Sequence, residues 1–259
     1  MSDRPIGIFD SGVGGTSIFY EINLLLPYEN SIYLADSANA PYGAKSKEDI
    51  IKLSVKNTEI LIKKNSKLIV VACNTATTNA IKVLRETYRV PFIGIEPAIK
   101  PAALNTKTNA IGILATRGTL SSELFHKTTD LYSRGIKVIE QEGEGIVSLI
   151  EEGKTNSTEM KSLLKIYLAP MLKANIDYLV LGCTHYPYLI PILLKMLPKH
   201  VKIIDSGQAV AKQTKAVLEK QQMLNTQIKR GYSKFYSNGN IEVLKSILST
   251  KHTINFMQF

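Results

Sequence analysis

The sequence has little cysteine and no long apolar run. Two cysteines in 259 residues exclude a disulfide-stabilised scaffold and every structural zinc site built on paired Cys-x-x-Cys motifs. No stretch approaches the roughly 18 uncharged apolar residues of a membrane span, and no apolar targeting segment follows the first residues, MSDRPIGIFD. We therefore expect a cytoplasmic protein that is not bound to a membrane.

Arginine is also scarce. Only six of the 32 basic residues are Arg, although the net charge is +10, a value that raises the question of a nucleic-acid partner. Bidentate recognition of phosphates and base edges depends on Arg more than on Lys, and the lysines are spread along the chain without interleaved aromatic residues. The sequence thus argues against nucleic acid as a partner.

What the chain does contain is a sizeable apolar fraction in a regular arrangement. Its 44% of hydrophobic residues include short runs rich in Ile, Val and Leu, which are typical of parallel strands buried on both faces. Segments with helical periodicity separate the runs, and one of them opens at Ser157 with a serine and a glutamate, like a capping box. The expected strands are 6–9, 31–35, 68–72, 92–95, 111–115, 137–140, 178–182 and 201–205. The predicted class is α/β with largely parallel sheets.

The two halves of the chain resemble each other. IGIFDSG at 6 aligns with IGILATRG at 111, LIVVACNT at 68 with YLVLGCTH at 178, and FIGIEPA at 92 with VKIIDSGQA at 201. Such a repeat predicts two similar lobes related by a pseudo-twofold axis, with the ligand site in the cleft between them. We expect a first domain of residues 1–97 plus a helix-rich return over 208–259, and a second domain of residues 98–207.

The two cysteines occupy equivalent places in this repeat. Cys73 and Cys183 each follow a predicted strand and open a polar turn. They could simply be small buried hydrophobic residues. A redox pair normally needs Cys-x-x-Cys, and a metal needs more ligands than two thiols and His185. Proton transfer to and from opposite faces of one carbon suits two opposed thiols, so we favour a two-base reaction at a carbon acid.

Such thiols need partners that set their protonation, because an ordinary cysteine is mostly protonated at neutral pH. His185 lies two residues after Cys183, and Asp10 ends the first predicted strand, on the same sheet edge as Cys73. Asp10 could equally cap a helix. Glu151, in LIEEG, is a weaker candidate for a second acid, since paired glutamates usually belong to a solvated helix end.

Small polar residues and glycines gather at the same strand ends. The loop DSGVGGTS matches neither dinucleotide nor P-loop fingerprints, but its backbone N–H groups could bind an anion such as a carboxylate. Pro41-Tyr42-Gly43 reads as a turn over the cleft. With backbone donors, several side chains could hold a small zwitterion: Ser11, Asn74, Thr75, Thr119 and Thr184.

These motifs together resemble glutamate racemases, cofactor-independent isomerases of the aspartate, glutamate and hydantoin racemase superfamily. The resemblance rests on IGIFDSGVGG, PYG, VVACNTATT, IGILATRGT, LGCTHYPYL and IIDSG and covers nearly the whole chain. It implies Cys73 and Cys183 as acid/base thiols, assisted by Asp10 and His185 respectively. The resemblance also implies a glutamate at the site, which corresponds to Glu151 or Glu152 in this chain. The implied substrate contacts are Ser11, Tyr42, Gly43, Asn74, Thr75, Thr119 and Thr184.

The sequence therefore predicts racemisation of L-glutamate to D-glutamate for peptidoglycan synthesis, with no cofactor and no metal. The expected partner is a small-molecule substrate, and a homodimer is one option for the assembly. Two alternatives stay open. One is a racemase for aspartate or a hydantoin, and the other is a two-lobed protein that binds an amino acid without turnover.

Overall fold

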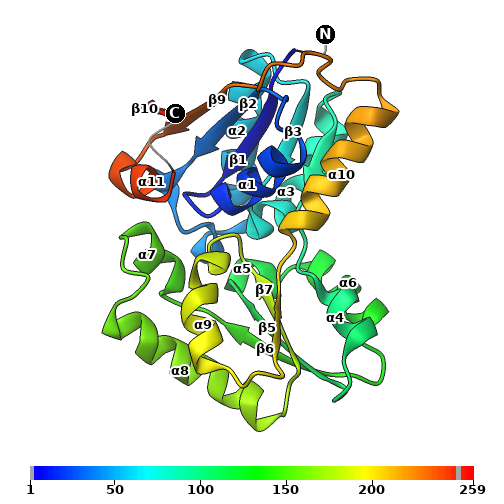
Figure 1. The fold of residues 1–259 in the computed structure, drawn as a ribbon, viewed down its shortest axis with the longest axis vertical. Helices are drawn as coiled ribbons and strands as arrows, with labels where there is room; N and C mark the ends of the chain where they lie inside the picture. The colour runs from blue at the N-terminus through cyan, green and yellow to red at the C-terminus, as the bar shows by residue number, and fades with distance from the viewer. Residues whose placement is uncertain (1–2, 249–251) are drawn as a thin grey trace.

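The computed structural model describes residues 3–248 and 252–259 and arranges them as two stacked α/β parts, each with a parallel sheet (Figure 1). The larger sheet has the order β10-β9-β2-β1-β3-β4 and the smaller one β6-β5-β7-β8. Their strands are β1 (Ile6–Asp10), β2 (Ser31–Ala35), β3 (Leu68–Val71), β4 (Phe92–Gly94), β5 (Ala110–Ala115), β6 (Lys137–Glu142), β7 (Tyr178–Gly182), β8 (Lys202–Ile204), β9 (Ser233–Ser237) and β10 (Thr253–Phe256).

Helices cover both faces of the larger sheet, which is why its central strands β1, β2 and β3 are buried throughout and mostly apolar. Ile8 of β1 packs in the cluster that includes Ile18 and Val210, whereas its neighbour Phe9 packs with Ile50 on the other face. The helices are α1 (Thr16–Leu25), α2 (Lys47–Lys63), α3 (Asn74–Thr87), α4 (Ile99–Asn105), α5 (Arg117–Leu120), α6 (Glu123–Tyr132), α7 (Ile146–Glu151), α8 (Thr158–Lys173), α9 (Ile190–Met196), α10 (Gly207–Lys220) and α11 (Ile241–Ile247).

The predicted fold class is confirmed. Every neighbouring strand pair is parallel, and each of the eight expected runs forms a strand. The segment β2-β1-β3-β4 of the larger sheet has the same order as β6-β5-β7-β8 in the smaller one, as expected for a repeated unit. Ser157 caps α8 by accepting a hydrogen bond from the backbone N–H of Met160.

The expectation of a helix-rich segment over 208–259 is only partly right. Helices α10 and α11 form there, and α10 packs against α1, but β9 and β10 extend the larger sheet beyond β2. Neither strand carries a continuous apolar run: in β9 only Phe235 and Ser237 are buried, and β10, at the sheet edge, exposes Thr253, Asn255 and Phe256. Partly exposed strands of this kind give no buried-strand signal in the sequence.

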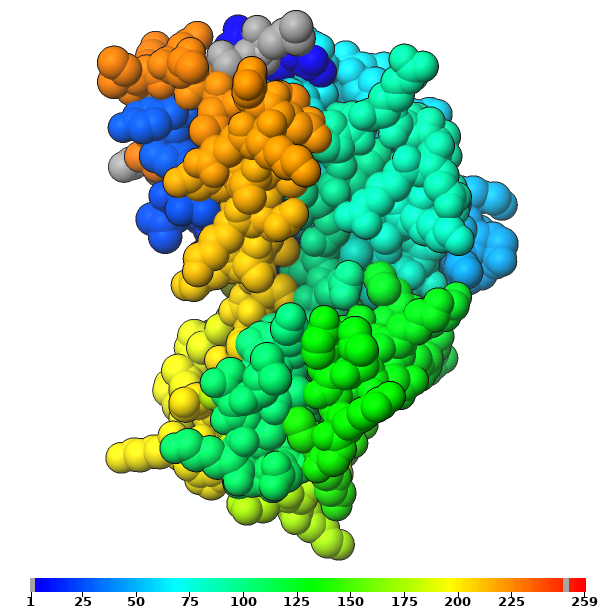
Figure 2. Space-filling model, turned by 90° about the vertical axis from the view of Figure 1, so that its right-hand side faces the viewer, coloured from blue at the N-terminus to red at the C-terminus, as the bar shows by residue number. Residues whose placement is uncertain are grey.

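The larger sheet thus takes its strands from both ends of the described chain. In Figure 2 the upper part is built from blue, cyan and orange residues and the lower part from green and yellow ones. The residue boundaries of the two predicted domains stay a prediction. Among the helices of residues 3–248 and 252–259, none is long and apolar enough to cross a bilayer.

Candidate active site

The carboxyl ends of four strands from both sheets lie around one small cavity. Asp10 ends β1, Cys73 comes two residues after β3, Thr116 follows β5 and Cys183 follows β7. The free volume of this cavity is about 10 Å³, on the order of the space that a single water molecule needs, so the site is nearly closed in this structure. Its walls are Ser11, Pro41, Tyr42, Gly43, Cys73, Asn74, Thr75, Thr116, Val147, Cys183, Thr184 and His185.

Cys73 is a buried free thiol at the start of α3. Its Sγ accepts a hydrogen bond from the backbone N–H of Ala76 at 3.4 Å and lies 3.6 Å from Ser11 Oγ. Burial and then the nearby Asp10 carboxylate raise the pKa of Cys73, and the Ala76 N–H only partly offsets them. In this structure Cys73 is therefore a protonated thiol at neutral pH, able to give a proton.

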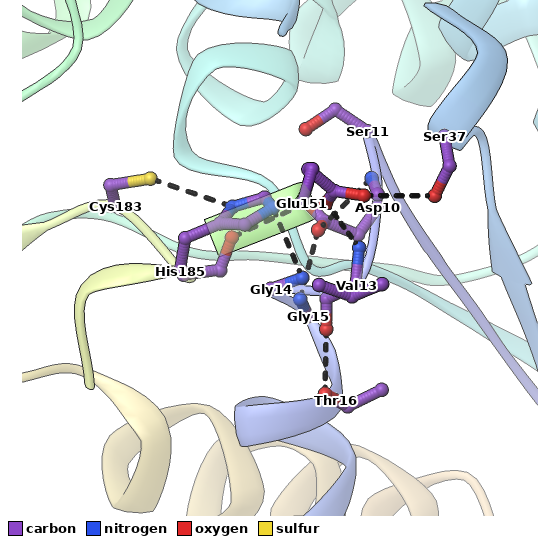
Figure 3. A network of polar contacts seen from close by, with 12 residues as sticks. Asp10, Ser11, Val13, Gly14, Gly15, Thr16, Ser37, Glu151, Cys183 and His185 are labelled. Atoms are coloured by element: carbon purple, nitrogen blue, oxygen red, sulfur yellow. Dashed lines mark hydrogen bonds and ion pairs between the residues drawn. The ribbon is translucent and has the colours of Figure 1, made fainter. Parts of the chain in front are cut away.

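Cys183 begins a chain of polar contacts that Figure 3 shows from close by. Its Sγ lies 3.8 Å from His185 Nδ1, and His185 Nε2 lies 2.5 Å from Glu151 Oε1. Burial lowers the pKa of His185, but the contacts with Cys183 and Glu151 outweigh it, so that this pKa stands well above its ordinary value. His185 thus retains a proton at neutral pH and can stabilise a thiolate at Cys183.

Glu151 points into the site and Glu152 points away from it. The Glu151 carboxylate accepts hydrogen bonds from the Val13 N–H at 2.6 Å and from Ser37 Oγ at 3.1 Å. Glu152 pairs instead with Lys154 at the surface, with 52% of its side chain exposed. The sequence left the choice between the two glutamates open, and the structure places Glu151 against His185.

Asp10 is completely buried and bridges the two parts of the molecule. Its Oδ2 accepts hydrogen bonds from the N–H groups of Gly12 and Gly15 at 3.3 and 2.8 Å, and Thr184 Oγ1 donates to its Oδ1 at 3.3 Å. Burial raises the pKa of Asp10, against the opposing effect of His185. The described structure gives Asp10 an electrostatic effect on Cys73, while its hydrogen bonds organise the glycine loop. The N-cap residue of α1 is Gly15, and no side chain caps this helix, so the alternative that Asp10 is a helix cap is wrong.

The glycine loop between β1 and α1 packs directly under the acid/base groups. Its N–H groups are used by protein partners: Val13 donates to Glu151, and the Gly14 N–H points at His185 Nε2 at 3.2 Å. A Cβ at Gly12 would overlap Glu151 Oε1, and one at Gly14 would overlap the His185 ring. The loop is glycine-rich because these side chains of the second half approach its backbone so closely.

We expect Gly12→Ala to destabilise the fold by about 1 to 3 kcal/mol, the usual cost of overpacking. The φ angle of Gly12 is not in the left-handed region, so the cost arises from the overlap with Glu151. Urea unfolding of the parent and the variant measures it. In a Glu151→Ala background the same substitution should cost little, and an equal cost in both backgrounds would contradict this explanation.

The polar walls of the cavity include a side chain without a protein partner. Asn74 is 3% exposed, and neither its Oδ1 nor its Nδ2 has a hydrogen-bond partner within the described structure. An unsatisfied buried amide is costly unless a ligand or water completes it. Asn74 lies at the N-terminus of α3, where backbone N–H groups also favour an anion.

The other predicted contact residues divide into two groups. Ser11, Tyr42, Gly43, Thr75 and Thr184 line the cavity with Asn74. Thr119 does not; it is buried one step behind the wall, with its Oγ1 3.4 Å from that of Thr75.

Sequence reasoning missed three residues at this site. Thr116 and Val147 line the cavity, and Ser37 binds Glu151. Thr116 follows strand β5 directly, so the rule that singled out the other strand-end residues would have found it. Ser37 had no such signal, because its partner lies 114 residues away.

His185 should make the stability of the protein depend on pH. Because its folded-state pKa is raised, its stabilising contribution is complete below the unfolded pKa of about 6.5 and is lost as pH rises through the folded pKa. The loss amounts to about 1.4 kcal/mol per pH unit within that window. We expect the parent to lose this stability in urea unfolding as the pH rises above about 6.5, and His185→Gln to lack the loss. Identical pH profiles would contradict the assignment.

No group of three or more His, Cys, Asp or Glu side chains suited to a metal ion occurs among residues 3–248 and 252–259. The cavity is lined by two thiols and an imidazole, and two carboxylates contact its walls from behind. Two thiols reach it from equivalent strand ends of the two sheets, and one of them contacts a buried His–Glu pair. Such an arrangement can remove a proton at one wall of the cavity and return one at another.

Comparisons with known proteins show which family the chain resembles. The Asp/Glu/Hydantoin racemase family model matches residues 21–214. The glutamate racemase of Herpetosiphon aurantiacus is 44% identical over 240 residues, covering 93% of this chain and 94% of the relative. The Escherichia coli glutamate racemase, solved with L-glutamate and an activator, superposes with a TM-score of 0.86 at 33% identity and 98% coverage of both chains.

A second solved structure, glutamate racemase from Francisella tularensis in complex with D-glutamate, has a TM-score of 0.85 at 30% identity and covers 100% of this chain and 98% of its own. The sequence resemblance is thereby confirmed over nearly the full length. The chain belongs to the glutamate racemase family.

Proposed function

We propose that this protein interconverts L- and D-glutamate without a cofactor, by proton transfer between the substrate Cα and two thiols, and so supplies D-glutamate for peptidoglycan. The observation that carries the proposal is the pair of buried thiols, Cys73 and Cys183, on the wall of one cavity. Each thiol has its own polar partners. The names of the relatives and of the two solved complexes support glutamate as the substrate.

We assign a role to each thiol from the groups that surround it. With His185 protonated next to it, Cys183 serves as the thiolate that takes the Cα proton, and an S–H bond forms as the C–H bond breaks. The electron pair left on Cα is delocalised into the substrate carboxylate. Cys73 then gives its proton to the other face of Cα, which inverts the centre. In the reverse reaction, Cys73 starts as the thiolate and Cys183 as the protonated thiol.

The acidity of Cα–H is the main difficulty, because the carbanion of a zwitterion is unstable in water. Fixed dipoles around the substrate carboxylate lower this barrier when water is excluded. We place the Asn74 amide, the start of α3 and the hydroxyl groups of Ser11, Thr75 and Thr184 in this role. With free space for about one water molecule in this structure, the cavity has little room for water.

The proposal is tested by following optical rotation of L-glutamate with purified, reduced protein after dialysis against a chelator, with L-aspartate in parallel. Decay of the glutamate signal alone supports the proposal. Decay of the aspartate signal alone would assign the protein to aspartate. Binding of glutamate without any decay would contradict an enzymatic role.

A homodimer and a cytoplasmic location remain further predictions, tested by sedimentation and by cell fractionation.

A further inference from the structure

The segment that carries Tyr42 into the cavity wall is held by one buried carboxylate. Asp36 comes directly after β2 and is 1% exposed. Its Oδ2 accepts a hydrogen bond from the Tyr42 hydroxyl at 2.5 Å, and its Oδ1 accepts one each from Asn39 Nδ2 at 2.8 Å and from Asn238 Nδ2 at 2.5 Å. All of these groups are donors, so the site requires a side chain that only accepts hydrogen bonds.

Asn238 ties this carboxylate to a distant part of the chain. Its Nδ2 donates to Asp36 and to the backbone oxygen of Phe259, and its Oδ1 accepts a hydrogen bond from the Ala38 N–H at 2.9 Å. Both Ala38 and Asp36 belong to the segment that leads to the cavity. The turn after β9 therefore holds this segment through Asn238, which does not line the cavity.

The same segment contacts the acid/base groups at its other surface. Ser37 donates to Glu151, the partner of His185, and Tyr42 forms part of the cavity wall. Tyr42 also accepts a hydrogen bond from Asn57 Nδ2 at 3.1 Å, so its hydroxyl is held at two points. A displacement of Asp36 would shift the cavity wall and the Glu151 contact together.

From this geometry we infer that Asp36 is a positioning residue for the reaction: its carboxylate, braced by Asn238, holds Tyr42 and Ser37 in place against the substrate and the His185–Glu151 pair. The inference rests on the proposed function, because it names the support of that same site. Asp36 does not line the cavity and acts on the substrate only through these neighbours.

The test compares Asp36→Asn with Tyr42→Phe and with the double variant. Asp36→Asn places an NH₂ group against converging donors, and we expect KM for glutamate to rise by roughly 10-fold or more, the scale of a lost hydrogen bond to a charged group. Because both substitutions break the same contact, the double variant should be no worse than the more impaired single variant. If the KM increases of the two single variants multiply in the double variant, Asp36 does not act through Tyr42, and this result would overturn the inference.

Asp177→Asn is the matched control. Asp177 is also a buried aspartate that accepts hydrogen bonds, from Thr106 Oγ1 at 2.6 Å and from the N–H of Lys107 at 2.6 Å, but it lies before β7, away from the cavity. It should lower the melting temperature and leave KM unchanged. An equal rise of KM in Asp36→Asn and Asp177→Asn would mean that KM reports only general destabilisation and would overturn the inference.

If Asp36→Asn does not fold, Asn238→Ala replaces it. Loss of the hydrogen bond from Asn238 to Asp36 should raise KM by roughly 3- to 10-fold, and a parental KM would contradict the role of Asp36.

Calorimetric titration with D-glutamate accompanies each assay. A parent that binds D-glutamate but does not racemise it would contradict the proposed function alone, and the Kd values of the variants would still test the inference. A parent that racemises, with variants at the parental KM and Kd, would contradict the inference alone.

Discussion

Cys183→Ala and Cys73→Ala should each lower the racemisation rate by roughly 10²- to 10⁴-fold, the usual contribution of a positioned acid or base. Both side chains are small and occupy the wall of an existing cavity, so folding should survive the change. Each variant loses both directions of the reaction, because inversion needs a base on one face and an acid on the other. Optical rotation of L- and D-glutamate measures the loss, and circular dichroism checks the fold.

Hydrogen exchange distinguishes two opposed thiols from any other role of the cysteines. A variant with one thiol can still remove and return a proton on its own face, so it should exchange Cα–H with D₂O in one enantiomer only. Cys73→Ala and Cys183→Ala should show opposite enantiomer preferences. If both exchanged the same enantiomer, or if either racemised at the parent rate, the two-thiol assignment would be wrong.

Glu151→Gln should have the second largest effect, a fall in racemisation rate of roughly 10- to 100-fold. The substitution keeps the size of the side chain but removes the charge that supports protonated His185 across the 2.5 Å contact. Hydrogen bonds to charged groups contribute about 1.5 to 3 kcal/mol, which corresponds to that range. The pH dependence of kcat/KM should shift to lower pH on the limb that reports loss of the His185 proton.

The neighbouring glutamate provides the control for this prediction. Glu152 pairs with Lys154 at the surface, so Glu152→Gln should retain the parental rate and pH profile. Equal effects of the two substitutions would show that Glu151 has no special role. The comparison also tests the resemblance to the family, which placed a glutamate at one of these two positions.

The sequence predicted the strands and the two thiols because both depend on local pattern. Buried parallel strands are continuous apolar runs, and the repeat placed Cys73 and Cys183 after equivalent ones. Rules of this kind fail for β9 and β10, whose side chains are partly exposed. They also fail to choose between Glu151 and Glu152, because adjacent helical residues differ in direction by about 100° and only the packing of α7 decides which one faces His185.

The support of the site could not be predicted for a different reason. Asp36 is bound by Asn238, a residue 202 positions away, and Ser37 by Glu151, 114 positions away. Neither pair has a spacing or motif that the sequence would reveal. The glycine loop shows the same limit: the sequence predicted backbone donors for an anion, and in the structure the N–H groups of Gly12, Val13 and Gly14 point at protein side chains.

The central claim is that one thiol removes the Cα proton and the other delivers a different one. The most direct test incubates unlabelled L-glutamate with the protein in D₂O, stops the reaction at low conversion, separates the enantiomers and measures deuterium at Cα in each by mass spectrometry. The account predicts deuterium in nearly all of the D-glutamate formed and little in the L-glutamate recovered. D-Glutamate that retains the original hydrogen, or equal deuterium in both enantiomers, would indicate a single base and contradict the account.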